Sequence, residues 1–230
     1  MLINNRINKG QTGFTLVEAL IGIALSMIVV TSMVGVMSNS LGSASRIIQM
    51  TQLSDDLRNT MSMVTRDMRR ANYNANAYRC YANSDCGTDG STNQSGTVFI
   101  NADNDCLLFN IDRNQDGDGS TDGAGGFRRS LSGTTGFIEM WVGGATPGCT
   151  GGHVDWIALT DPEFVDVTTF NIDDSASITG SILEEGGGTL NLDTRQVKVQ
   201  IVGQLILDRT ITRSIEDTIK VRNDYLWRSP

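Results

Sequence analysis

The sequence contains few of the residues on which metal binding and catalysis usually depend. Its 230 residues include one histidine, His153, and four cysteines, none of which forms a Cys-x-x-Cys pair. These side chains leave no plausible Cys/His zinc set, and the Gly-x-Ser-x-Gly motif of serine hydrolases is absent. With only three prolines, the chain is not an extended linker protein. We therefore predict a non-enzymatic protein that requires no cofactor.

Positive charge is also scarce. The chain has 18 Lys and Arg against 26 Asp and Glu, which gives a net charge of −8 and a pI near 4.6. A broad phosphate-binding surface needs the opposite sign, so direct contact with nucleic acid is not expected. The one local basic cluster, Arg66, Arg69 and Arg70, includes Asp67 and is interpreted as the solvated face of a helix.

The four cysteines are Cys80, Cys86, Cys106 and Cys149. All of them follow a long hydrophobic segment, in the part of the chain that such an anchor places outside the cytoplasm. Disulfides form in that compartment, so two disulfides are predicted, with free buried thiols as the alternative. Four cysteines allow three connectivities, and the sequence does not choose among them.

An uncharged segment near the amino terminus has the length of a membrane span. No charged residue occurs between Ala19 and Ser45, and the apolar stretch from Ala19 to Met37 approaches the roughly 20 residues that cross a bilayer. Arg6 and Lys9 precede it without an acid, which indicates a cytoplasmic amino terminus. A cleaved secretory signal has a hydrophobic region of only about 7–15 residues. The segment is therefore predicted to be a single-pass anchor.

One carboxylate, Glu18, lies at the entrance of this apolar segment. A carboxylate in an apolar segment is costly and by default has a functional partner; snorkelling to the interface is the alternative. The stretch Gly13-Phe14-Thr15-Leu16-Val17-Glu18 resembles the processing motif of type IV prepilins and type II secretion pseudopilins. The resemblance implies a leader of residues 1–13 that prepilin peptidase removes after Gly13. It also implies N-methylation of Phe14, and pairing of Glu18 with the new terminal amine of a neighbouring subunit.

The chain after the apolar segment predicts an α+β fold. One apolar face runs through Met50, Leu53, Leu57, Met61, Val64 and Met68, at the three- and four-residue spacing of a helix. The long helix is thus predicted to comprise a membrane and filament-core part, 14–45, and an amphipathic part, 46–72. A β-rich globular domain is predicted for 73–230, with strands at 97–100, 107–111, 127–131, 137–142, 154–159, 165–172 and 196–207. Residues 210–221 are predicted as a strand or a short helix.

A long amino-terminal helix packed on an antiparallel sheet is the type IV pilin architecture. Thr65–Ala71 and Val221–Asn223 further resemble segments of the PilW-type minor pilins and their J-type pseudopilin relatives. This resemblance implies a minor pilin that primes type IV pilus assembly, and through it serves twitching motility or DNA uptake. It places the protein in the bacterial inner membrane with a periplasmic domain, and in the pilus, with the tip as one position. The implied partners are prepilin peptidase, other minor pilins, the major pilin and the inner-membrane assembly platform.

One acidic stretch has the ligand spacing of a calcium loop. Oxygen-bearing side chains occupy positions 1, 3, 5, 7 and 9 of an EF-hand-like pattern, namely Asp112, Asn114, Asp116, Asp118 and Ser120, with Gly117 at position 6. Gly123 stands where the bidentate glutamate is expected. A Ca²⁺ site is therefore one interpretation and an acidic hairpin turn the other. A J-type pseudopilin and an anchored periplasmic calcium-binding domain remain as alternative functions.

Overall fold

The structure is a computed structural model that describes residues 13–75, 98–112, 124–143, 147–152, 154–183 and 188–229. The chain divides into two compact units, residues 1–48 and 49–230. A single helix occurs among the described residues, α1 (Leu16–Met68), which is 53 residues long. It is followed by strands only. Chain order is therefore a helix followed by a β-domain, which confirms the predicted α+β pilin fold.

In the first unit, every described residue of α1 is exposed, its apolar side chains included. Several of its hydroxyl groups are bonded within the helix: Ser26 Oγ donates to the Ile23 carbonyl at 2.8 Å, and Thr31 Oγ1 donates to the Met27 carbonyl at 2.7 Å. Ser32 and Ser40 make equivalent bonds. Because polar groups inside a bilayer must be satisfied within the protein, this helix is suited to a lipid environment despite its serines and threonines.

In the second unit, α1 buries one face. The fully buried side chains Leu53, Leu57, Val64 and Met68, together with Met61 at 5% exposure, follow the predicted spacing and confirm the amphipathic helix. The helix ends at Met68. Asn72 adopts a φ of 63°, a left-handed conformation typical of helix carboxyl ends. The Asn223 Nδ2 amide then donates to the Ala71 carbonyl at 2.9 Å, so the carboxyl-terminal segment caps the helix.

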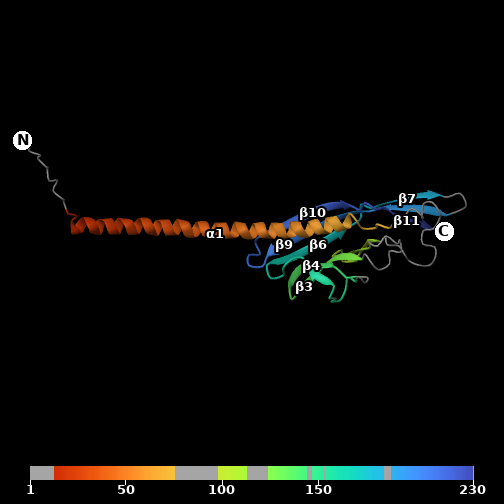
Figure 1. Cartoon of the computed structure of the whole chain (residues 1–230), viewed down its shortest axis with the longest axis horizontal. Helices are drawn as coiled ribbons and strands as arrows, with labels where there is room; N and C mark the ends of the chain where they lie inside the picture. Colours follow the sequence, from red (N-terminus) through yellow and green to blue (C-terminus); the bar gives the residue numbers. More distant parts are fainter. Residues whose placement is uncertain are drawn as a thin grey trace, which may run out of the picture. The chain divides into compact units, whose positions relative to one another are not determined.

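The strands form three antiparallel sheets (Figure 1). The largest has the order β1-β2-β3-β4-β5, and the others are β10-β9-β6 and β11-β8-β7. The first sheet contains β1 (Phe99–Ile100), β2 (Cys106–Phe109), β3 (Gly125–Ser132), β4 (Thr135–Trp141) and β5 (Trp156–Ala158). The second contains β6 (Val165–Asp173), β9 (Gln196–Leu205) and β10 (Thr212–Lys220). The third contains β7 (Ile178–Leu183), β8 (Thr189–Thr194) and β11 (Tyr225–Ser229).

The predicted strands all have counterparts in the first two sheets, and residues 210–221 form strand β10 rather than a helix. The third sheet was not predicted at all. Its strand β7 is exposed at every residue. Side-chain hydrogen bonds join β7 to β8, from Thr179 Oγ1 to Asp193 at 2.6 Å and between Ser181 and Asn191 at 2.7 Å.

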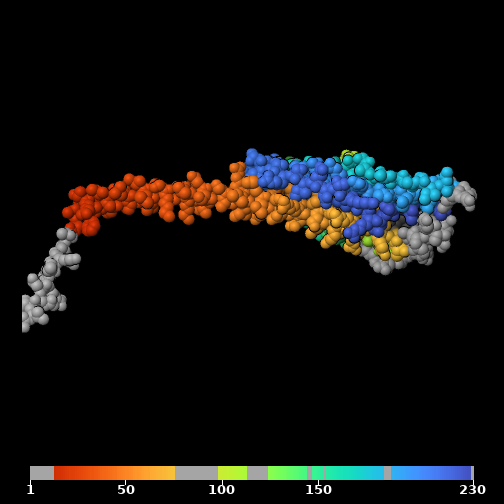
Figure 2. All heavy atoms as spheres, turned by 90° about the horizontal axis from the view of Figure 1, so that it is seen from above, coloured from red at the N-terminus to blue at the C-terminus, as the bar shows by residue number. Residues whose placement is uncertain are grey.

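The core lies between α1 and the sheets. From residue 49 on, α1 runs beside the carboxyl-terminal part of the chain, which is drawn in blue in the space-filling view (Figure 2). The helix lies close to β9 at Gly203, where an added Cβ would lie 3.1 Å from a Leu57 methyl and 3.2 Å from Val165. Leu57 fills the space that a side chain at 203 would otherwise need, so the helix packs across the middle strand of the β10-β9-β6 sheet. One flank of α1 therefore adjoins β10 and the other adjoins β6.

One disulfide, Cys106–Cys149, joins β2 to the segment 147–152, with the two Cα atoms 5.8 Å apart. Beside it, the buried Arg128 pairs with Glu139 at 2.8 Å and donates to the Gly151 carbonyl at 2.7 Å. A disulfide was predicted, and the structure selects its pairing. Cys80 and Cys86 lie outside the described residues.

Candidate functional site

The proposed cleavage site lies directly before α1. Gly13, Phe14 and Thr15 precede the first helical residue and all are exposed, Phe14 to 83%. A Cβ built on Gly13 would meet no atom within 4 Å, and Gly13 is not among the glycines with positive φ. The fold of the described residues therefore does not require glycine at this position. A requirement for glycine here would come from recognition by another protein.

Glu18 and Thr15 form the amino-terminal cap of α1. The Glu18 backbone N–H donates to Thr15 Oγ1 at 3.3 Å, and Thr15 Oγ1 lies 3.4 Å from Glu18 Oε2. A threonine that accepts from the residue three positions on is the N-cap half of a capping box. A carboxylate in the first turn also interacts favourably with the helix dipole. Glu18 therefore has a local role in starting the helix, whatever its role toward a neighbouring chain.

Sequence reasoning missed this cap, although its signal is present. Thr15-Leu16-Val17-Glu18 has the Thr-x-x-Glu spacing that precedes an apolar helix. The spacing places helix initiation only two residues after the Gly13–Phe14 bond. Removal of residues 1–13 would therefore leave the cap intact, since both of its partners belong to the mature chain.

The candidate calcium loop is described only at its first residue. Asp112 is 1% exposed, and its Oδ2 accepts the Ala75 backbone N–H at 2.9 Å, so this carboxylate holds the chain that follows α1. Asn114, Asp116, Asp118 and Ser120 lie outside the described residues. Within the described ranges, no group of three or more His, Cys, Asp or Glu side chains is arranged to hold a metal ion.

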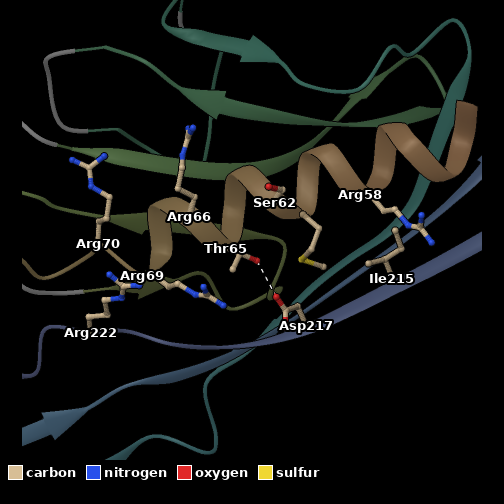
Figure 3. Close-up of a pocket in the computed structure, with 10 residues that line it drawn as sticks. Arg58, Ser62, Thr65, Arg66, Arg69, Arg70, Ile215, Asp217 and Arg222 are labelled. Atoms are coloured by element: carbon tan, nitrogen blue, oxygen red, sulfur yellow. Dashed lines mark hydrogen bonds between the residues drawn. The ribbon is translucent and has the colours of Figure 1, made fainter.

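A basic groove lies between the carboxyl-terminal half of α1 and β10 (Figure 3). It has a volume of about 570 Å³ and is lined by Arg58, Arg66, Arg69, Arg70 and Arg222. The acid nearest to them in the groove, Asp217, accepts from Thr65 Oγ1 at 3.1 Å and from the Thr218 N–H at 2.8 Å. The sequence placed three of these arginines on a solvated helix face, but did not reveal that Arg222 joins them.

An acidic groove lies on the opposite flank of α1, beside the start of β6. It has a volume of about 480 Å³, and Asp55, Asp56 and Asp161 are among the residues that line it. Burial, and then the nearby Asp161 carboxylate, raise the pKa of Asp56 above its usual value of 3.8. Asp56 Oδ2 is buried without a hydrogen-bond partner among the described residues, so this carboxylate is imperfectly accommodated by its own chain.

Two known sequence families match the chain. Residues 8–34 match the prokaryotic N-terminal methylation motif, a range that contains Gly13, Phe14 and Glu18. Residues 46–221 match the family described as prepilin peptidase-dependent protein B. No curated protein and no solved structure shows a significant match. The α1 segment is long and apolar enough to span a membrane, as expected for an anchored protein. Since the second match covers most of the chain, the protein belongs to the prepilin peptidase-dependent protein B family and is a pilin-like substrate of prepilin peptidase.

Proposed function

We propose that the protein is a minor pilin that takes part in priming type IV pilus assembly. Processing after Gly13 leaves Phe14 as the methylated terminus of α1, whose first half anchors the chain and then enters the filament core. The β-domain lies in the periplasm and contacts other minor pilins, the major pilin and the inner-membrane assembly platform. The protein itself carries out no catalysis and requires no cofactor.

The observation that carries this proposal is the position of Gly13, two residues before the threonine cap that begins α1. The glycine has open space around it and no positive φ, so the fold of the chain does not account for it. A peptidase that cleaves after glycine does account for it. An amine created by that cleavage can neutralise the Glu18 carboxylate of a neighbour, since each charge compensates the desolvation of the other. Processing and assembly are thereby linked.

The first experiment is a count of surface pili by electron microscopy in a strain lacking this gene, with an assay of secreted enzymes in the same strain. Loss or sharp reduction of pili with normal secretion is expected. Normal pili with failed secretion would instead assign the protein to a type II secretion system as a J-type pseudopilin. If both remained normal, the filament function would be refuted.

The pairing of Glu18 with the terminal amine of a neighbouring subunit is tested separately from its role in the helix cap. Glu18→Gln removes the charge but keeps an oxygen that can accept hydrogen bonds, whereas Thr15→Ala removes the cap and keeps the charge. If Glu18 pairs with a terminal amine, Glu18→Gln abolishes assembly into pili and Thr15→Ala does not. Equal effects of the two variants would show that the carboxylate acts only on its own helix. Mass spectrometry of each variant checks that cleavage after Gly13 still occurs.

Calcium binding remains a separate proposal, based on the spacing from Asp112 to Ser120. Titration of the purified chain with Ca²⁺ is expected to give one saturable site, which Asp116→Asn and Asp118→Asn weaken. An unchanged heat signal on Ca²⁺ addition would identify the segment as an acidic turn.

A further inference from the structure

Strand β7 lacks the features that usually keep an edge strand from pairing with another chain. An edge strand presents a row of unpaired N–H and C=O groups, which native proteins protect by shortness, charge, proline or a β-bulge. β7 forms one edge of the β11-β8-β7 sheet. It is six residues long, contains no charged residue and no proline, and pairs with β8 in one continuous register without a bulge. Its outer edge is therefore open to a further strand.

The other edge strands of the described sheets are protected in one of these ways. β1 is two residues long and β5 is three residues long, so both are too short to pair with a long segment. β10 contains four charged residues, and β11 contains Arg228. The pairing of β6 is interrupted by a register shift between Val167 and Thr169. Among the described edges, β7 is thus the exception, which indicates that its edge has a use.

The apolar side chains of β7 are exposed as well. Ile178 and Ile182 are 69% and 63% exposed, and residues four apart in a strand point to the same face. Leu192, 39% exposed, continues this apolar strip on β8, opposite Gly180. A Cβ built on Gly180 would meet only the Leu192 carbonyl oxygen, at 4.0 Å, so the strip has an open gap between the two isoleucines. A small sheet depends on a covered apolar face for its stability, and this part of the face is uncovered.

The charges near β7 disfavour a second copy of this chain as the added strand. Asp173 and Asp174 precede β7, Asp193 lies on the neighbouring strand, and the two residues that follow β7 in the sequence are glutamates. Asp174 pairs with Arg195 at 3.2 Å, which leaves an excess of negative charge. Two β7 strands, parallel or antiparallel, would place the acids of one copy beside those of the other, and like charges that face one another are destabilising. A segment with basic ends would instead be attracted.

We propose that β7 binds an extended segment of a different polypeptide, which adds a fourth strand to the sheet. The backbone of this segment pairs with the outward N–H and C=O groups of β7, and its alternate apolar side chains cover Ile178, Ile182 and the gap at Gly180. Lys or Arg at its ends lies near the acids around β7. In this mode of recognition the main-chain hydrogen bonds supply affinity and the alternate side chains supply specificity. The inference goes beyond the proposed function and does not depend on it, because no residue of α1 takes part.

The first test uses a fluorescent peptide of alternating Val and Thr with Lys at both ends. It is titrated against the full chain in detergent micelles, with protein-free micelles as the blank, and fluorescence anisotropy is expected to show saturable binding. The same peptide with two internal residues replaced by proline cannot pair as a strand, and the same peptide with Glu at both ends is repelled. Both are expected to bind at least about tenfold more weakly.

Hydrogen exchange followed by mass spectrometry then locates the contact. The Lys-ended peptide is expected to slow amide exchange in residues 178–183, because outward N–H groups of β7 become hydrogen-bonded. Exchange in β10, an edge strand that is charged, is expected to stay unchanged.

Two variants test the side chains of β7. Ile178→Thr with Ile182→Thr removes exposed apolar area but keeps β-branched side chains, which favour a strand. This double change is expected to weaken binding of the Lys-ended peptide about tenfold, with an unchanged Tm. Leu207→Thr is the matched control, since Leu207 is 82% exposed and lies outside the sheet; it should leave the affinity unchanged.

Several results would overturn the inference. These are no saturable binding up to about 1 mM peptide, slowed exchange only outside residues 178–183, and equal affinity for the Lys-ended and proline-containing peptides. Equal affinity for the Lys-ended and Glu-ended peptides would refute the basic character of the partner. Cross-linking between two Ser181→Cys chains in membranes, lost when the peptide is added, would identify a second copy as the occupant and refute the choice of a different polypeptide.

Discussion

Removal of the Cys106–Cys149 disulfide is expected to cause a large and calculable loss of stability. The bond joins residues 43 positions apart, and the chain-entropy relation assigns about 4 kcal/mol to a loop of that length. For a domain of this size, each kcal/mol corresponds to about 2–4 °C in Tm. Cys106→Ala with Cys149→Ala is therefore expected to lower Tm by roughly 8–16 °C. Thermal unfolding of the mature chain in detergent, followed by circular dichroism, measures the change.

The comparison variant is Cys80→Ala with Cys86→Ala. If these cysteines form the second disulfide that the sequence predicts, their loop of a few residues is worth only about 2 kcal/mol, and the shift in Tm should be about half as large. A shift below about 3 °C for the Cys106–Cys149 variant would refute the reasoning. It would show that the Arg128 hydrogen bonds to the carbonyls of Cys149 and Gly151 hold that segment without the covalent bond.

Three further changes probe the helix-to-sheet packing and two titrating groups. Leu57→Ala removes a fully buried side chain and should cost about 3 kcal/mol, measured by denaturant unfolding; a cost below about 1 kcal/mol would show that α1 does not depend on this contact. Folding raises the pKa of Asp56, chiefly through burial. The protonated Asp56 carboxyl therefore adds to the free energy of unfolding below pH 3.8, and this contribution is lost as pH rises through the folded-state pKa. Asp56→Asn should therefore raise Tm at pH 7 but not at pH about 3, and an equal change at both would contradict the shift. Burial, and then the Asp193 carboxylate, raise the pKa of Tyr225 to about 12. An increase in tyrosinate absorbance near that pH should therefore be absent in the Tyr225→Phe variant. The free energy of unfolding of the unmodified protein should fall between pH about 10 and 12.

The helix and the first two sheets were predictable because their signals are local. Leu53, Leu57 and Val64 follow the helical period, and β9 alternates between buried and exposed residues along its length. Periodicity reports burial on one face of an element, and these elements are buried on one face. Of the helix residues that were predicted to face the core, Met50 is partly buried and the others are buried.

The third sheet could not be predicted from the same kind of signal. No residue of β7 is buried, and β8 contains Asn191 and Asp193, residue types that strands usually avoid. What orders these strands is their pairing, including the Thr179–Asp193 and Ser181–Asn191 hydrogen bonds. Cross-strand contacts of this kind depend on register, which a pattern along a single segment does not contain.

The candidate sites also differ in whether one short segment of the sequence contains all of their residues. Gly13 and Glu18 lie within one short motif, so their importance could be inferred from neighbouring residues alone. The basic groove is assembled from residues about 150 positions apart. Arg69 directly follows α1, and Arg222 is brought to it by the pairing of β10 with β9 and by the backbone hydrogen bond between the two residues. Net charge averages over such clusters, and here an acidic chain contains a concentrated basic surface. A negative total therefore argues against a broad phosphate-binding surface, but it does not show where the basic and the acidic side chains gather on the folded chain.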